Sequence, residues 1–269
     1  MVLVKIGVCG DPHADYELFE IFLNKALAKH IDLLILPGDF CNGRTLPDDA
    51  TTQDFIDQLE PINTLLAKIS TPIFFILGNH DPIELAETLS LHRHIKNIHG
   101  KNVDWNGYII GGIGGSHYIT PQLQNKTVPF PEGRIPFLFN NTPYLEYLKT
   151  THHKNDPYLY SGVHLMYDKI FPCDILISHT PPLLPENKNF HEASVGLYNL
   201  IRKHKPLLNL SAHVHEPEIH IKTISWEKVS PSWTTTLVYL GSLDNMKICI
   251  IILTKYKKMV EQIEILPID

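Results

Sequence analysis

Apolar runs and helical repeats alternate through the first 80 residues of the chain. Short apolar runs predict buried strands at residues 2–9, 33–36 and 72–77. Between them, apolar residues recur every three or four positions, which predicts helices at 15–27 and 52–69, with a kink or break at Pro61. This order predicts parallel strands joined by right-handed crossovers, whose carboxyl ends form a ligand-binding edge.

The rest of the chain predicts a second set of strands. A glycine-rich strand over 109–113 runs into Gly114-Gly115-Ser116, and the irregular segment 117–157 that follows is a candidate lid over a binding site. Residues 158–170 could form a helix. Further strands are predicted at 174–178 and 206–211, with a helix around 195–201 between them. The last four apolar runs predict an antiparallel meander at 218–224, 235–240, 248–253 and 260–266.

Length and composition fit one large domain or two small ones, and we expect a single domain over residues 1–269. The chain is 43% hydrophobic with a net charge of −6, and the absence of any lysine or arginine block disfavours a dedicated nucleic-acid-binding surface. The N-terminal run is too short for a signal peptide, and the run at 248–253 is too short to span a bilayer, so we expect no membrane association. The four cysteines form no C-x-x-C pair, so we expect a reduced, cytoplasmic protein.

Polar side chains that can bind metals follow most of the predicted strands. They are Asp11, His13, Asp39, Asn79, His80, His179, His213 and His215. Carboxylate, amide oxygen and imidazole together suit manganese, iron, zinc or similar ions, whereas calcium and magnesium prefer all-oxygen ligands. Because these ligands are too many for one tetrahedral ion, we expect two divalent ions, which can clamp a phosphate and activate a water. A single D-x-H or H-x-H pair is usually a surface feature, so the prediction depends on the motifs occurring together.

The motifs resemble those of the calcineurin-like metallophosphoesterases, in that family's order and over most of the chain. The matching stretches are Asp11-x-His13, Gly38-Asp39-x-x-Asn42, Gly78-Asn79-His80-Asp81, Ser178-His179 and Ala212-His213-x-His215. The resemblance implies an α/β fold, a four-layer αββα sandwich of two mixed β-sheets flanked by helices, with the metals at the sheet edge. Small bacterial and archaeal phosphoesterases of the family look most similar. The chain departs from the pattern at Asn42, usually aspartate, and at Ala212, usually glycine, and neither change removes a ligand.

The resemblance also implies a role for each site residue. The first ion would be held by Asp11, His13 and His215. The second would be held by Asn79, His179 and His213, and Asp39 would bridge both. A bridging hydroxide would attack phosphorus in line, and His80, oriented by Asp81, would protonate the leaving oxygen or stabilise its charge. The implied activity is metal-dependent hydrolysis of a small phosphomonoester or phosphodiester.

Alternative interpretations stay open for some of these residues. Asn42 and Arg44 are candidates to contact a substrate phosphate, although a plain surface arginine is equally consistent with the sequence. Cys41 is interpreted as a spectator thiol. The chain could instead be a metal-binding interaction scaffold, like a retromer subunit of the same family that lacks the catalytic histidine, but the presence of His80 favours an enzyme. A nuclease is a further alternative, which the acidic charge balance disfavours.

Overall fold

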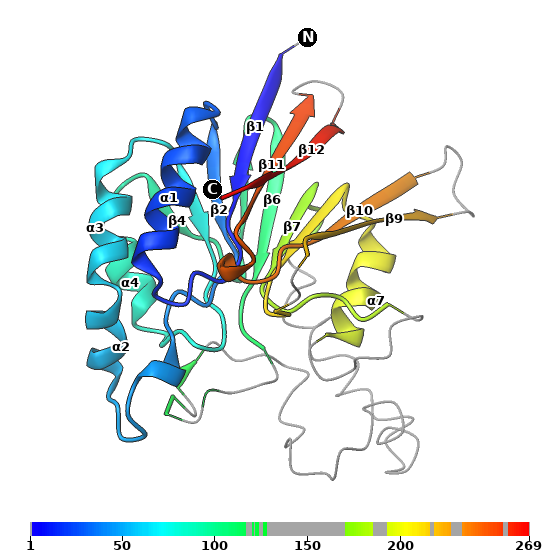
Figure 1. The fold of residues 1–269 in the computed structure, drawn as a ribbon. Helices are drawn as coiled ribbons and strands as arrows, with labels where there is room; N and C mark the ends of the chain where they lie inside the picture. The colour runs from blue at the N-terminus through cyan, green and yellow to red at the C-terminus, as the bar shows by residue number, and fades with distance from the viewer. Residues whose placement is uncertain are drawn as a thin grey trace, which may run out of the picture.

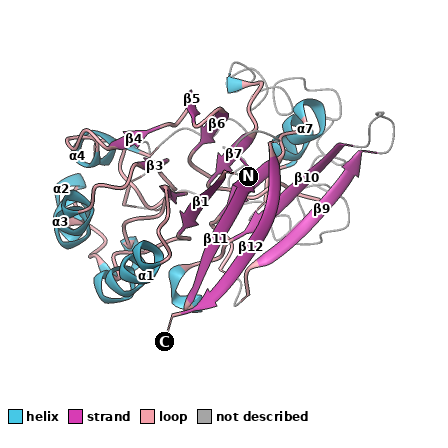
Figure 2. Ribbon diagram, turned by 90° about the horizontal axis from the view of Figure 1, so that it is seen from above, coloured by secondary structure: helices cyan, strands magenta, loops and turns pink. Residues whose placement is uncertain are grey.

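Two six-stranded β-sheets pack face to face, and helices cover their outer faces (Figures 1 and 2). Helices from the first 90 residues lie against one sheet, and helix α7 (Val195–His204) lies against the other (Figure 2). The four-layer α/β arrangement is therefore confirmed. The structure is a computed structural model that describes residues 2–116, 120, 122–123, 126–127, 170–184, 193–215, 218–226, 233–254 and 258–268.

Two of the sequence predictions fall almost wholly outside the described residues. These are the irregular segment 117–157 and the helix at 158–170. Among the helices that the structure does describe, none has both the length and the apolar character needed to cross a bilayer.

The first sheet is built around four parallel strands. They are β1 (Leu3–Val8), β2 (Leu33–Leu36), β3 (Ile73–Phe75) and β4 (Ile95–Asn97). Two antiparallel strands, β11 (Lys247–Thr254) and β12 (Met259–Pro267), extend this sheet beside β1. The three strands predicted in the first 80 residues are confirmed, and they run parallel as expected.

Four helices cover the outer face of the first sheet. They are α1 (Tyr16–Ala28), α2 (Thr52–Gln58), α3 (Glu60–Lys68) and α4 (Leu85–Leu89). Helix α1 begins at Asp15, whose carboxylate accepts the N–H of Leu18 at 3.0 Å. The predicted break in the 52–69 helix is confirmed, but it falls at Leu59. Pro61 lies in the first turn of α3, where its missing N–H removes no helical hydrogen bond.

The second sheet has a parallel centre and antiparallel edges. Its order is β5 (Asn102–Trp105), β6 (Tyr108–Ile113), β7 (Ile175–Ser178), β8 (Leu208–Ser211), β10 (Trp233–Tyr239) and β9 (His220–Trp226). Strands β6, β7, β8 and β10 run parallel, and the antiparallel strands β5 and β9 occupy the edges.

The last four strands do not form the single meander that the sequence predicted. Strands β9 and β10 form a hairpin in the second sheet, where β10 lies parallel to β8. The chain then crosses through the 3₁₀ turn η5 (Leu243–Asn245) to the first sheet, where β11 and β12 form a second hairpin. Residues 248–254 of β11 are all buried. The apolar run at 248–253 correctly predicted a buried strand. Such a run indicates that a strand is buried, but it does not indicate which strand pairs with it.

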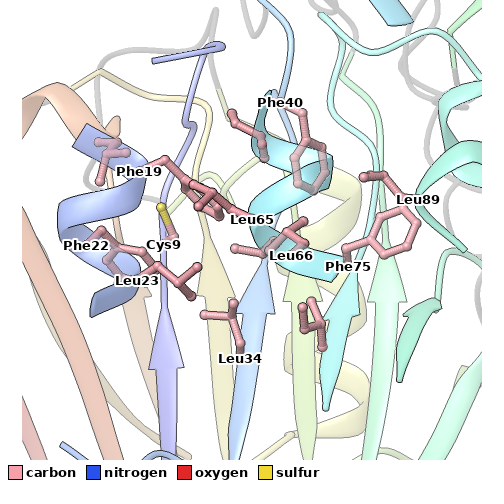
Figure 3. Close-up of a cluster of buried hydrophobic side chains, with 14 of the residues drawn as sticks. Cys9, Phe19, Phe22, Leu23, Leu34, Phe40, Leu65, Leu66, Phe75 and Leu89 are labelled. Atoms are coloured by element: carbon pink, nitrogen blue, oxygen red, sulfur yellow. The ribbon is translucent and has the colours of Figure 1, made fainter. Parts of the chain in front are cut away.

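Three apolar clusters fill the spaces between the four layers. Figure 3 shows Phe19, Phe22 and Leu23 of α1 packing with Leu34 of β2 in the cluster under the helices. A fully buried side chain of this size contributes about 1.5–3 kcal/mol to stability. A second cluster lies between the sheets, where the hydroxyl of Tyr108 also donates to the carbonyl of Thr254 in the facing sheet at 2.6 Å. These contacts hold the sheet edges, and therefore the loops that leave them, in fixed relation.

Candidate metal centre

The candidate site lies where strands of both sheets end. From the first sheet come Asp11 and His13 after β1, Asp39 after β2, and Asn79 and His80 after β3. From the second come His179 after β7, and His213 and His215 after β8. Hydrogen bonds and short contacts connect these side chains across the two sheets. The structure thus brings together all eight polar residues singled out at the strand exits.

Six of these side chains form two groups whose potential ligand atoms lie within 4.8 Å of one another. The first group is Asp11, His13 and His215. The second is Asp39, His179 and His213. Each group combines one carboxylate with two imidazoles, a set that suits divalent first-row ions. Each group could therefore hold one metal ion.

The spacing of acceptor atoms in these groups fits a cation. Nε2 of His13 lies 3.0 Å from Nε2 of His215, and Nε2 of His179 lies 3.0 Å from Oδ1 of Asn79. Oδ1 of Asp11 is buried without a hydrogen-bond partner among the described residues. A buried carboxylate oxygen in that state is costly unless a cation or a water binds it.

Contacts on the opposite ring nitrogen orient two of the imidazoles. Nδ1 of His179 donates to the carbonyl of Pro37 at 3.0 Å, and Nδ1 of His13 donates to the carbonyl of Cys41 at 3.1 Å. Because a carbonyl can only accept, each contact places the proton on Nδ1 and leaves Nε2 available to a metal. These backbone partners lie in the loops after β2.

Ser116, predicted only as part of a turn, contacts a residue of the site. Its buried hydroxyl lies 3.0 Å from Nε2 of His213 and helps to orient that ring. Ser116 lies shortly after β6, so its position behind a strand was the signal that could have identified it. A second contact, from the hydroxyl of Thr120 to the carbonyl of Asn79 at 2.8 Å, fixes the backbone of another site residue.

Buried carboxylates give the site a field that attracts cations. Burial alone would raise the pKa of Asp39, but the imidazoles of His179 and His80 hold it well below its usual range. Burial lowers the pKa of His179, yet the charge of Asp39 and its buried neighbours outweighs this and raises that pKa to about 9. A fully buried imidazole that holds a proton so strongly lies where a metal cation would also be stabilised.

Asp81 joins two loops of the site and does not orient His80. Its carboxylate accepts the backbone N–H of Cys41 at 3.0 Å and that of Gly78 at 2.8 Å. A second carboxylate also connects these loops: Oδ1 of Asp39, after β2, accepts the backbone N–H of His80, after β3, at 2.8 Å. The predicted orienting contact is therefore wrong: both Asp81 oxygens accept from the backbone, and Nδ1 of His80 has no hydrogen-bond partner within the described part of the chain. Burial, with the nearby Asp39, raises the pKa of Asp81 to about 7.

The backbone of these loops is unusually tight. A Cβ added at Gly78 would lie 2.0 Å from Oδ1 of Asp39, so only glycine allows the two loops to approach this closely. Three site residues have left-handed backbones, with φ of 44° at His13, 50° at Asp39 and 71° at His213. Such conformations cost of order 1–3 kcal/mol each and are concentrated at functional sites.

His80 points away from its neighbour Asn79. Its ring lies 5.2 Å from the ring of His13 in an edge-on arrangement, whereas Asn79 faces His179 in the second group. His80 is 6% exposed, and burial lowers its pKa. The neutral ring still carries one N–H that can be donated. Its place beside the first group is compatible with a contact to a bound substrate.

An open cleft of about 230 Å³ adjoins the first group. It is lined by Pro12, His13, Asp15, Asn42, Arg44, His215, Ser242 and Asp244. The cleft contains Asn42 and Arg44, but Oδ1 of Asn42 accepts the N–H of Arg44 at 3.1 Å and caps the short turn η1 (Gly43–Thr45). No sequence motif indicated that Asp15, Ser242 or Asp244 would contribute.

Cys41 lies next to the site. Its thiol is buried and donates to the carbonyl of Phe55 at 3.4 Å. Burial and the carboxylates of Asp81 and Asp39 raise its pKa well above the ordinary value. The thiol is therefore neutral, which agrees with the interpretation of Cys41 as a spectator.

Comparisons with known proteins identify the same architecture. A family model described as calcineurin-like phosphoesterase matches residues 4–217. The fold is similar to the crystal structure of the protein TT1561 of Thermus thermophilus, with 18% identity, a TM-score of 0.61 and 100% of both chains covered. It is also similar to a dimetal phosphatase from Danio rerio, with 12% identity, a TM-score of 0.53 and 99% of both chains covered. No curated protein matches the sequence significantly.

Proposed function

The chain belongs to the calcineurin-like phosphoesterase family, and from this premise we propose that it hydrolyses small phosphoesters with two divalent metal ions. Asp11, His13 and His215 would hold the first ion. Asn79, His179 and His213 would hold the second, with Asp39 between them. Two ions at such a site neutralise phosphoryl charge and lower the pKa of a nucleophilic water.

The protein's own contribution is to fix the ligands before the ions bind. The carbonyls of Pro37 and Cys41 set the proton on one nitrogen of His179 and of His13. The clamp between Asp81 and two backbone N–H groups holds the loops after β2 and β3 together. Preorganisation of this kind removes the cost of arranging charges and ligands during the reaction.

His80 would act on the substrate and not on the metals. We assign it to donate a hydrogen bond to the leaving oxygen as the ester bond breaks, or, in its protonated form, the ring proton itself. One combination of features in the structure supports the proposal most strongly. Two carboxylate–imidazole groups lie at one sheet edge, and beside the first lies the nearly buried imidazole of His80, whose Nδ1 has no hydrogen-bond partner among the described residues.

Hydrolysis of nitrophenyl and alkyl phosphoesters by manganese-loaded protein tests this function. We expect activity that chelation abolishes and manganese restores. His80→Asn should keep its metal and lose about 10²–10⁴-fold in turnover, more for alkyl esters than for nitrophenyl esters, whose leaving groups need little protonation.

The matched control is His30→Asn, at an exposed left-handed position that asparagine tolerates. This variant should retain both activity and metal content. Loss of metal in parallel with activity in His80→Asn would identify His80 as a ligand. Wild-type protein that hydrolyses no phosphoester with any divalent metal would contradict the proposed function and favour a scaffold.

A further inference from the structure

The C-terminal part of the chain forms one wall of the cleft beside the first metal-binding group. This part lies beyond residues 4–217, which the family model matches. Leu243 donates its N–H to the carbonyl of Asp11 at 3.1 Å, and the hydroxyl of Ser242 donates to the same carbonyl at 3.3 Å. The turn η5 is therefore bonded directly to a residue that we propose as a metal ligand.

Packing fixes η5 in this position. Leu243 is 2% exposed and belongs to the apolar cluster between the first sheet and its helices. The preceding loop passes so close to β1 that a Cβ added at Gly10 would lie 2.0 Å from the carbonyl oxygen of Gly241. Asp244 follows Leu243 and lines the cleft. The fold therefore places Asp244 at the cleft that adjoins the first group.

The cleft contains charged groups of both signs. Arg44 comes from the turn after β2, whereas Asp15 caps the start of α1 and Asp244 lies in η5. Within the described parts of the chain, neither the guanidinium of Arg44 nor the carboxylate of Asp244 makes a hydrogen bond or an ion pair. Both side chains can therefore bind a ligand without first breaking such a contact.

Size and charge together restrict what this cleft can accept. Its volume of about 230 Å³ corresponds to about seven or eight waters at ~30 Å³ each, which suits a small organic group. Arg44 can neutralise phosphoryl oxygens that are not bound to metal. Two carboxylates would repel a second anionic group, and they would accept hydrogen bonds from hydroxyl or ammonium groups.

We propose that this cleft selects phosphoesters whose alcohol part is small, carries hydroxyl or ammonium groups and lacks a second anionic group, with Asp244 as the specificity-determining residue. This inference rests on the proposed phosphoesterase function, which places the phosphoryl group at the metals and directs the ester group into the cleft. Asp244 lies outside the stretch that the family model matches, so the selection belongs to this chain's own C-terminal segment.

A matched set of substrates tests the proposal. Glycerol 3-phosphate carries a hydroxymethyl group at the position where 3-phosphoglycerate carries a carboxylate. Phosphoethanolamine carries an ammonium group. We expect kcat/KM of the manganese-loaded wild type to favour the hydroxyl and ammonium esters over 3-phosphoglycerate. Asp244→Lys should shift that ratio by about tenfold or more toward 3-phosphoglycerate, the size expected for losing a charged hydrogen bond. Asp244→Asn should shift it less.

Glu261→Lys, the same charge reversal at an exposed position on β12, is the matched control and should leave the ratio unchanged. Metal content is measured for every variant, and binding of the three esters to each loaded protein is measured by calorimetry. An unchanged ratio and unchanged relative binding in Asp244→Lys would overturn the inference. If no ester is hydrolysed but Asp244→Lys reverses their order of binding, the specificity inference stands and the proposed hydrolysis fails.

Discussion

The orientation of single imidazole rings in the site is fixed by contacts on one of the two ring nitrogens. The imidazoles of His13 and His179 turn one nitrogen to a backbone carbonyl, and His213 turns one to the hydroxyl of Ser116. The candidate ligands could be predicted from the sequence, because each of them closely follows a predicted strand. The orientation of each ring is set by residues distant in sequence, so the sequence alone could not predict it.

The role of Asp81 in the structure differs from the one that its position next to His80 suggests. Its position next to His80 suggested an orienting contact, but the carboxylate instead bonds Cys41 and Gly78. Replacement by asparagine keeps the shape and one acceptor, and it turns an amide N–H₂ toward the other backbone donor. Asp81→Asn should therefore loosen the two ligand-bearing loops and weaken metal binding about 10–100-fold.

Metal titration of Asp81→Asn, beside the same substitution at Asp104, checks this expectation. Asp104 is an exposed aspartate that accepts the N–H of Gly107 in the turn between β5 and β6, far along the chain from the motifs. We expect Asp104→Asn to bind metal like the wild type. Unchanged metal affinity in Asp81→Asn, with only turnover reduced, would contradict the role of Asp81 in holding the ligand-bearing loops.

At the scale of elements, helix α7 shows how a helix start supports the site. The hydroxyl of Ser194 accepts the N–H of Leu197 at 2.9 Å and caps the helix. The backbone of Ser194 also pairs with the loop after His179, through the carbonyl of Pro181 and the N–H of Leu183, both at 2.8 Å. The helix N-terminus and a ligand-bearing loop therefore form one connected unit.

Ser194→Ala should lower the free energy of unfolding by about 1 kcal/mol, because it removes the cap from a fully buried helix start. Denaturant unfolding of this variant and of Ser90→Ala is the measurement. Ser90 is exposed at the end of α4, where helix capping does not need its hydroxyl, so its loss should be nearly neutral. Equal stabilities of the two variants would contradict the capping role.

At the scale of the whole molecule, the two sheets must keep a fixed relation because the site takes ligands from both. The hydroxyl of Tyr108 reaches from β6 to the carbonyl of Thr254 in β11, and both residues are buried. Tyr108→Phe keeps the ring and removes the hydrogen bond between the sheets. We expect it to lower the free energy of unfolding by about 1–2 kcal/mol.

Calorimetric or denaturant unfolding measures this cost, with Tyr16→Phe as the control. The hydroxyl of Tyr16 is 3.5 Å from the carboxylate of Glu20, a long contact at a partly buried position, and its removal should change stability little. If Tyr108→Phe were as stable as Tyr16→Phe, the contact between the sheets would contribute nothing measurable.

The sequence could predict whatever is encoded locally, and it could not predict which distant segments meet. Apolar periodicity located the strands and most helices, and the polar residues behind them located the site. The same pattern assigned the last four strands to one meander, whereas β11 lies beside β1 in the other sheet. The contribution of Asp244 to the cleft follows from that crossing, so no local sequence pattern could predict it.

Metal stoichiometry tests the central claim, that two ions share this site, most directly. Elemental analysis of manganese-saturated protein should give two ions per chain for the wild type and about one for His13→Ala. Asp39→Asn should lose more than one, because the carboxylate proposed to lie between both ions is removed. Anomalous scattering from the loaded protein locates each ion independently. One ion or none in the wild type, or equal single-ion losses in the two variants, would contradict the account.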